Sequence, residues 1–287
     1  MKKIFKKALK IFTVVITISI VVLVVLFYRF STPKSDKKIE ADFLKSNSSI
    51  YLRQHQFKDY KYRVLTTKKE LDSTLPTVVF VHGSIGSLLD FKTYLKDEGL
   101  NKGANLISYD RIGYGINYTG EVKESIAFES DLLADLIKDI PSNNIILVGY
   151  SYGGPIALAI KNKVKRIILL APAVYSKVEP MPWALNLYKW KFTRNLMPKI
   201  WQAASKEKLS HKIDLERFEN NWSKNKSNII SIHGDEDWIV PYSNSIYLQE
   251  NIINKQFELV TLKEAGHGLV WSHFKEIKKV LLQQINK

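Results

Sequence analysis

The chain has 287 residues, which is enough for one large α/β domain with a short appendage. It contains no cysteine, and this excludes disulfides, thiol catalysis, cysteine metal sites and a lipid anchor through cysteine. The formal net charge is +15, of which +8 lies in residues 1–38 and +7 in the remainder.

The first 30 residues have the composition of a membrane anchor. Five lysines lie in the first ten residues: Lys2, Lys3, Lys6, Lys7 and Lys10. The uncharged run Ile11–Phe27 follows them, and as a helix it would reach about 26 Å, near the lower limit for a bilayer. We predict an uncleaved transmembrane signal-anchor within residues 1–30. A cleaved signal peptide is the alternative, although Phe27-Tyr28-Arg29-Phe30 is a poor cleavage site.

The charges beside this run predict its orientation. Five lysines precede it, and four basic residues follow it: Arg29, Lys34, Lys37 and Lys38. Since positive charge favours the cytoplasmic side, we expect a single-pass protein of the cell membrane with a cytoplasmic N-terminus. Residues 31–59 are expected to be a tether and lead-in, and residues 60–287 an extracytoplasmic catalytic domain.

Apolar runs alternate with helix-like stretches along residues 60–287. Strands are expected at 60–65, 77–82, 104–109, 144–149, 165–171, 228–233 and 256–262. Helices are expected at 88–95, 125–140 and 242–253. This alternation predicts an α/β fold, with a mostly parallel central sheet and helices on both of its faces. The aromatic-rich residues 173–227 interrupt the alternation.

Ser151 is the candidate nucleophile. It lies in Gly149-Tyr150-Ser151-Tyr152-Gly153, between a buried strand-like run and a helix-like run that begins near Pro155. A serine between two glycines at a strand-to-helix turn is the G-x-S-x-G elbow. The tight turn needs glycine, and the next helix directs free N–H groups at the reacting centre. An ordinary Gly-Ser turn is the alternative.

A serine hydroxyl needs a base, usually a histidine oriented by a carboxylate. Of the six histidines, His267 is the best candidate, because it lies between two glycines in a loop after the last expected strand. Three acids, Asp235, Glu236 and Asp237, follow the strand at 228–233. Physical reasoning from the sequence does not choose among them.

These motifs, in this order, resemble the α/β-hydrolase superfamily. The resemblance implies that Asp237 is the acid, because His233 to Pro241 matches His-Gly-x-x-Asp-x-x-Val-Pro. It also implies an oxyanion hole from the backbone N–H groups of Ser84 and Tyr152. The resemblance implies that residues 173–227 form a small helical lid lining an apolar acyl pocket. An ordinary helical connection, with its aromatic residues in the core, is the alternative. His82 is expected to hold its loop by hydrogen bonds, and the neighbours Asp110 and Arg111 to form a structural pair.

The expected function is a membrane-anchored serine hydrolase, esterase- or lipase-like, that cleaves a carboxylic ester or related acyl bond. An acyltransferase and a non-catalytic ligand-binding protein are the alternatives. The sequence has no His-Glu-x-x-His and no Gly-Lys-Ser/Thr loop, so we expect no metal and no cofactor. The expected partners are a small acyl molecule, either lipid-like or not, and the membrane. No nucleic-acid partner is expected. The substrate and the oligomeric state are not readable from the sequence.

Overall fold

The structure, a computed structural model, describes residues 2–116, 122–252 and 256–287. The chain divides into two compact units, Met1–Pro33 and Lys34–Lys287. The first unit is one long helix, α1 (Lys2–Phe30). Within it, the 27 residues Ile4–Phe30 are long and apolar enough to cross a membrane. By composition alone, such a helix fits either a membrane anchor or a signal sequence.

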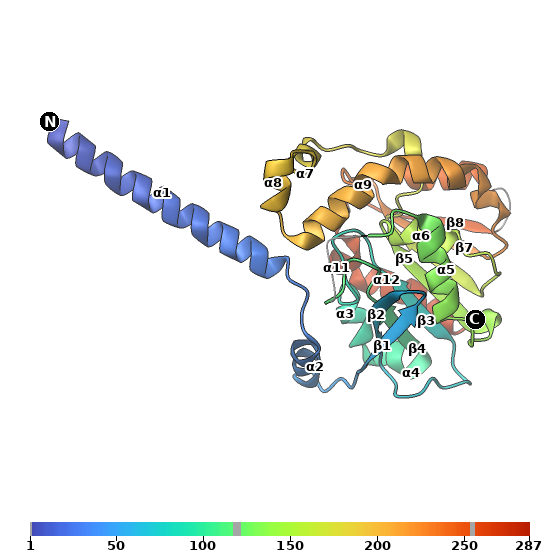
Figure 1. The fold of residues 1–287 in the computed structure, drawn as a ribbon. Coiled ribbons are helices and arrows are strands. Elements are labelled where there is room, and N and C mark those ends of the chain that lie inside the picture. Colours follow the sequence, from blue (N-terminus) through green and yellow to red (C-terminus); the bar gives the residue numbers. More distant parts are fainter. Residues whose placement is uncertain (1, 117–121, 253–255) are drawn as a thin grey trace. The chain divides into compact units, whose positions relative to one another are not determined.

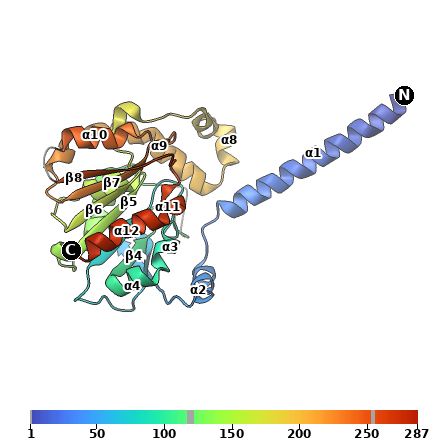
Figure 2. The ribbon, with the colours of Figure 1, turned by 180° about the vertical axis from the view of Figure 1, so that it is seen from behind.

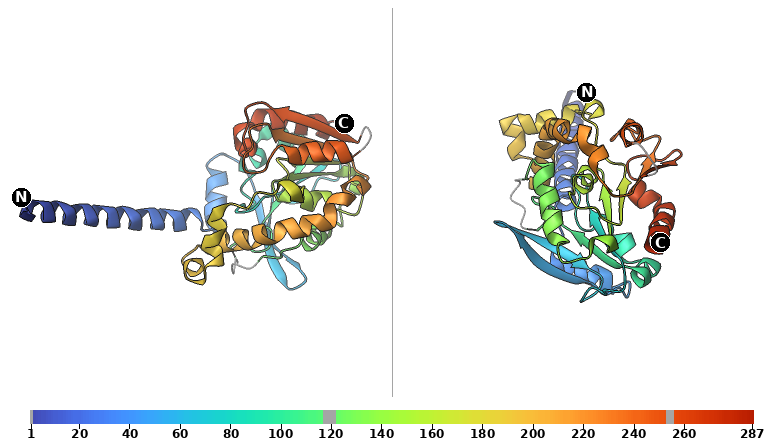
Figure 3. Two further views of the ribbon diagram at one scale, coloured as in Figure 1. Left: turned by 90° about the horizontal axis from the view of Figure 1, so that it is seen from above. Right: turned by 90° about the vertical axis from the view of Figure 1, so that its right-hand side faces the viewer.

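The second unit is built on an eight-stranded sheet (Figure 1). In spatial order its strands are β1 (Tyr51–Phe57), β2 (Tyr60–Thr66), β4 (Asn105–Tyr109), β3 (Thr77–Val81), β5 (Ile145–Tyr150), β6 (Arg166–Leu170), β7 (Ile229–Gly234) and β8 (Phe257–Leu262). The pairs β1–β2 and β2–β4 are antiparallel, and the other neighbours are parallel. The β1–β2 hairpin projects beyond the rest of the sheet (Figure 3). The predicted mostly parallel sheet is confirmed.

Helices cover both faces of the sheet (Figures 1 and 2). One face carries α5 (Ile126–Leu136), α6 (Gly153–Leu158) and α10 (Ser243–Asn251). The other carries α2 (Asp36–Leu44), α3 (Lys92–Leu95), α4 (Glu98–Gly103), α11 (Leu269–Ser272) and α12 (Phe274–Ile285). Successive strand residues point to opposite faces, so Val79 and Leu147 enter one core while Val78 and Ile146 enter the other.

Residues 34–59 differ from the expected tether and lead-in. Helix α2 buries Ile39 and Phe43, which are four residues apart and therefore share one helix face. The Asp36 carboxylate lies 2.8 Å from the guanidinium of the buried Arg63. Strand β1 pairs with β2 along its whole length. The second unit thus begins 26 residues before the expected domain start at residue 60.

A helical insertion, residues 173–227, connects β6 to β7. Its helices are α7 (Asn186–Lys189), α8 (Lys191–Asn195) and α9 (Lys199–Phe218), with short 3-10 turns before α7 and after α9. Helix α9 lies against loops at the carboxyl ends of the strands. On α9, Glu207 contacts Ser84 beyond β3, and the Nε2 atom of His211 lies 3.1 Å from the Ala173 carbonyl oxygen beyond β6.

Candidate active site

Ser151 lies at a sharp turn between β5 and α6. Its φ is +52°, in the left-handed region that non-glycine residues seldom adopt. A Cβ atom at position 153 would lie 2.2 Å from the Val81 carbonyl oxygen, and one at position 149 would lie 2.4 Å from the Gly153 carbonyl oxygen. Both motif glycines are therefore required by close backbone packing. The turn leaves Ser151 partly exposed at the edge of the sheet.

The imidazole of His267 lies between Ser151 and Asp237. Its Nε2 atom is 3.1 Å from Oγ of Ser151, and its Nδ1 atom is 2.7 Å from Oδ2 of Asp237. With Nδ1–H donating to the carboxylate, Nε2 is left to accept the hydroxyl proton. The three side chains follow β5, β7 and β8, and parallel strands present their carboxyl ends at one edge of a sheet.

Several hydrogen bonds hold the Asp237 carboxylate. Its Oδ1 atom accepts from the backbone N–H groups of Ile239 at 2.9 Å and Val240 at 2.8 Å. Its Oδ2 atom lies 3.3 Å from Nε2 of His233. Burial raises the pKa of Asp237, but hydrogen bonds from His233 and His267 outweigh burial and hold this pKa well below its usual range. An ionised carboxylate therefore faces His267.

The neighbouring acids have other positions. Asp235 accepts a 2.7 Å hydrogen bond from the backbone N–H of Glu264 and so braces the loop that carries His267. Asp235 and Glu236 are both exposed. Among the residues that the structure describes, Asp237 is the acid of this trio that contacts His267. The geometry thus separates three carboxylates that residue type alone does not distinguish.

Two contacts of the site were not anticipated. The ring of Tyr150 stacks on the imidazole of His267, with centroids 5.2 Å apart, and its hydroxyl donates to the His267 carbonyl at 3.0 Å. His233, near the end of β7, contacts Asp237 in the loop that follows this strand. The sequence carries a signal only for His233, which stands in the His-Gly-x-x-Asp register.

Ser84 and Tyr152 lie on loops that meet at Ser151. Strands β3 and β5 pair with Val81 opposite Gly149, and this register carries Gly83 to the side of Ser151. A Cβ atom on Gly83 would lie 2.9 Å from Cβ of Ser151. Glycine at position 83 therefore lets the loop approach the elbow closely.

His82 holds this loop by hydrogen bonds, as expected. Its Nδ1 atom lies 2.7 Å from the Gly83 carbonyl oxygen, and its Nε2 atom accepts from the backbone N–H of Arg111 at 2.9 Å. Burial, and then the charge of Arg111, lower the pKa of His82 well below its usual range. The ring is therefore neutral, with its proton on Nδ1.

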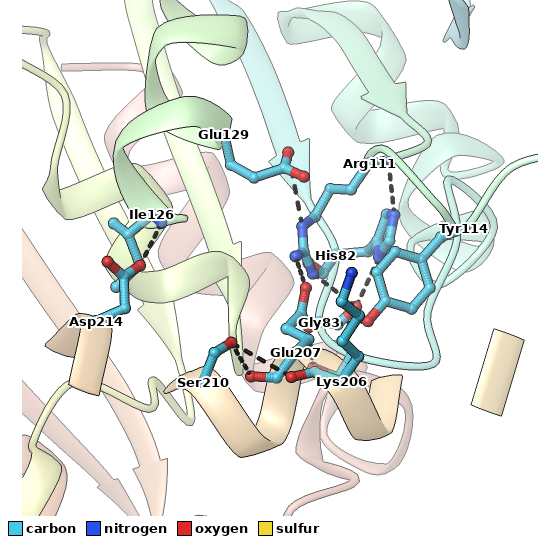
Figure 4. Close-up of polar contacts among 11 residues, drawn as sticks. His82, Gly83, Arg111, Tyr114, Ile126, Glu129, Lys206, Glu207, Ser210 and Asp214 are labelled. Atoms are coloured by element: carbon cyan, nitrogen blue, oxygen red, sulfur yellow. Dashed lines mark hydrogen bonds and ion pairs between the residues drawn. The ribbon is translucent and has the colours of Figure 1, made fainter. Parts of the chain in front are cut away.

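The expected pairing of Asp110 with Arg111 is wrong. Asp110 accepts from Nε of Arg63 at 2.7 Å and from the backbone N–H of Leu88 at 3.0 Å. Arg111 pairs instead with Glu207 of α9 (Figure 4). The two residues follow directly after β4, and each reaches a different partner.

Within residues 2–116, 122–252 and 256–287, no group of three or more His, Asp or Glu side chains is arranged to hold a metal ion.

Comparisons with known proteins agree with this architecture. The sequence model of the Alpha/beta hydrolase family matches residues 78–277. A protein of Mycoplasma pneumoniae assigned by name to the esterase/lipase class is 25% identical over 259 residues, covering 73% of this chain and 91% of the relative.

Solved structures share the fold at low sequence identity. MGS-M2, an alpha/beta hydrolase enzyme from a deep-sea metagenome library, is 18% identical with a TM-score of 0.64, covering 82% of this chain and 98% of its own. The esterase EaEST from Exiguobacterium antarcticum is 17% identical, with a TM-score of 0.59 and coverages of 82% and 99%. A bacterial membrane phospholipase A is 14% identical, with a TM-score of 0.61 and coverages of 97% and 99%. The chain belongs to the α/β-hydrolase family, as an esterase/lipase-like hydrolase.

Proposed function

We propose that this protein is a membrane-anchored serine hydrolase that cleaves a carboxylic ester, or a related acyl bond, through an acyl-enzyme on Ser151. One observation carries the proposal: hydrogen-bond contacts run from Ser151 through His267 to Asp237, at 3.1 and 2.7 Å. A serine hydroxyl attacks a carbonyl carbon efficiently only when a base accepts its proton.

The proposed reaction has two stages. Nε2 of His267 accepts the hydroxyl proton while Oγ of Ser151 bonds to the carbonyl carbon, and the carbonyl electron pair moves to oxygen. Collapse of this intermediate expels the alcohol, which takes the proton from His267. Water then attacks the acyl-enzyme with His267 as base, and Ser151 leaves with the proton as the carboxylic acid forms. Asp237 holds the Nδ1–H tautomer and stabilises the imidazolium.

The developing oxyanion is assigned to the backbone N–H groups of Ser84 and Tyr152. Such main-chain donors each contribute roughly 3–4 kcal/mol to the stability of the transition state. Two features support the assignment. Gly83 brings its loop against Ser151, and Tyr152 directly follows Ser151 at the start of α6. The helix N-terminus adds a partial positive charge at this point.

A substrate with an acyl chain suits the surface of the helical insertion, which we interpret as a lid. Trp183 is 68% exposed and Phe192 is 79% exposed, and Trp190 and Met181 are also exposed. Residues 180–206 contain five basic residues and no acidic residue. Exposed aromatic side chains among basic ones are typical of surfaces that meet anionic lipid headgroups.

The same proposal places the protein in the cell membrane through α1, with the catalytic unit outside. The support is the length of the apolar helix and the excess of lysine before it. An anchored enzyme would encounter lipid-like substrates at high local concentration.

Active-site labelling tests the function. The full chain in detergent should react with a fluorophosphonate probe and should hydrolyse p-nitrophenyl esters. Ser151→Ala should lose both properties, whereas Asp235→Asn should keep the label. Equal labelling of Ser151→Ala and wild type would contradict the proposal.

A further inference from the structure

Glu207 lies near the middle of α9, and its carboxylate is fully buried. Its partners lie 93 to 123 residues earlier in the chain. Oε1 accepts hydrogen bonds from the hydroxyl of Ser84 and, at 2.9 Å, from that of Tyr114. Oε2 forms an ion pair with the guanidinium of Arg111. Figure 4 shows this carboxylate directed at Arg111 and Tyr114.

Arg111 also contacts the loop residues that precede Ser84 and the residue that follows Ser151. Its Nη1 atom donates to the carbonyl oxygens of Gly83 at 3.3 Å and His82 at 3.5 Å. Its guanidinium lies 4.4 Å from the centre of the Tyr152 ring, a cation–π distance. The Arg111–Glu207 pair thus contacts the loop that carries Ser84 and the residue that follows the nucleophile.

We propose that Glu207 is a positioning residue for the oxyanion hole. By holding the Ser84 hydroxyl and Arg111, it fixes the loop 82–87 relative to Tyr152. This inference rests on the proposed function, because it assumes that Ser84 and Tyr152 donate to the oxyanion.

The loop requires such support for two reasons. Ile85, the residue after Ser84, has a φ of +60°, which is costly for a β-branched side chain and persists only where the surroundings enforce it. In addition, a donor stabilises an oxyanion only within about 2.7–3.1 Å of the developing charge. Arg111 neutralises the Glu207 carboxylate, so the support adds little net negative charge near the oxyanion.

Asp214 provides a matched control on the same helix. It is also a buried carboxylate of α9, and it accepts a 2.5 Å hydrogen bond from the backbone N–H of Ile126 at the start of α5. Figure 4 shows that this contact lies apart from the Glu207 cluster. Asp214 therefore helps to dock α9 without touching the loop of Ser84.

The experiment compares Glu207→Gln, Ser84→Ala, their double variant and Asp214→Asn in the full chain. For each, kcat and KM on a p-nitrophenyl ester and the thermal midpoint are measured. We expect Glu207→Gln and Ser84→Ala each to lower kcat about tenfold, with KM changed by less than about twofold. The kcat of the double variant should fall by no more than about tenfold, because both changes disrupt the same contact between Glu207 and Ser84. Asp214→Asn should lower the thermal midpoint but keep kcat within about twofold.

The proposal is overturned if the fold-losses of kcat in Ser84→Ala and Glu207→Gln multiply in the double variant. It is also overturned if Asp214→Asn lowers kcat as much as Glu207→Gln does. If Glu207→Gln does not fold, Ser84→Ala decides alone, since it removes one hydroxyl and keeps the backbone N–H. Wild-type kcat in that variant would refute the inference. Ser151→Ala is assayed in parallel. Full activity of Ser151→Ala would refute the proposed function. An inactive Ser151→Ala together with a fully active Glu207→Gln would refute only this inference.

Discussion

Tyr150 contacts His267 through both its ring and its hydroxyl. The two rings stack with centroids 5.2 Å apart and an interplanar angle of 30°, and the Tyr150 hydroxyl donates to the His267 carbonyl at 3.0 Å. The residue before the proposed nucleophile therefore restrains the proposed base. The strand that presents Ser151 thus also fixes the group that must accept its proton.

Tyr150→Phe should lower kcat about fivefold and leave KM unchanged, because it removes one hydrogen bond, worth about 1 kcal/mol, and keeps the stacking. Tyr150→Ala should lower kcat further, since the imidazole then loses both restraints. Tyr242→Phe, which removes a hydroxyl paired with Thr261, is the control and should behave as wild type. Steady-state kinetics on a soluble ester would measure these effects. An unchanged kcat in Tyr150→Ala would contradict the positioning role.

Asp237→Asn should lower kcat by about 10⁴, because an amide favours the wrong imidazole tautomer and cannot stabilise the imidazolium. Asp235→Asn should stay within about tenfold of wild type, since an amide oxygen can still accept from the Glu264 backbone. Both variants replace a carboxylate with an amide. Because Asp237 is buried and Asp235 is exposed, the thermal midpoint of each variant is measured beside kcat. The opposite ranking in an ester assay would assign the acid to Asp235.

Glu129 should make stability depend on pH. Burial raises its pKa to about 7, although the nearby Arg111 opposes this shift. Between about pH 4.5 and 7 the unfolded chain releases a proton that the folded protein keeps, so wild-type stability falls as pH rises through this window. Glutamine at position 129 does not titrate, so the Glu129→Gln variant lacks this pH-dependent loss of stability. Its free energy of unfolding, relative to wild type, should therefore increase on the order of 2 kcal/mol from pH 4.5 to 8.

Urea unfolding of the full chain in detergent, followed by tryptophan fluorescence, would measure this difference. Glu250→Gln makes the same change at an exposed glutamate and serves as the control. If the difference in the free energy of unfolding between Glu129→Gln and wild type does not change with pH, burial does not raise the pKa of Glu129.

The proposed topology predicts that protease added to intact cells or spheroplasts will remove a C-terminal tag. The expectation follows from five lysines before the apolar run against four basic residues after it. A cytoplasmic protein should remain intact as the control. If the tag stays protected until the cells are lysed, the catalytic unit is cytoplasmic. Release into the medium of a chain that lacks the N-terminal apolar segment would instead favour a cleaved signal peptide.

Much of the fold was predictable because its signals are local. The buried runs that became β3 and β5 are short, apolar and rich in β-branched residues, so both were located within about a residue. The glycines at 149 and 153 marked the elbow because only they fit its backbone. Ser151 and His267 could be chosen from such local patterns, whereas Asp237 needed the resemblance to a family.

Other features depend on contacts that a local pattern does not contain. Glu207 meets Ser84 across 123 residues, and nothing in the composition of α9 distinguishes this buried glutamate from exposed ones. The polar segment that became α2 was expected to be a tether, because only Ile39 and Phe43 indicate its packing. Arg111 was assigned to its neighbour for the same reason: its partner lies 96 residues away.

Peptide mapping of the covalent adduct tests the central claim most directly. The full chain is incubated with a fluorophosphonate, digested and analysed by mass spectrometry, with His267→Ala in parallel. We expect one adduct per chain, on Ser151, formed at least about 10³-fold more slowly in His267→Ala. An adduct on another serine, or an equal rate of labelling without His267, would contradict the claim.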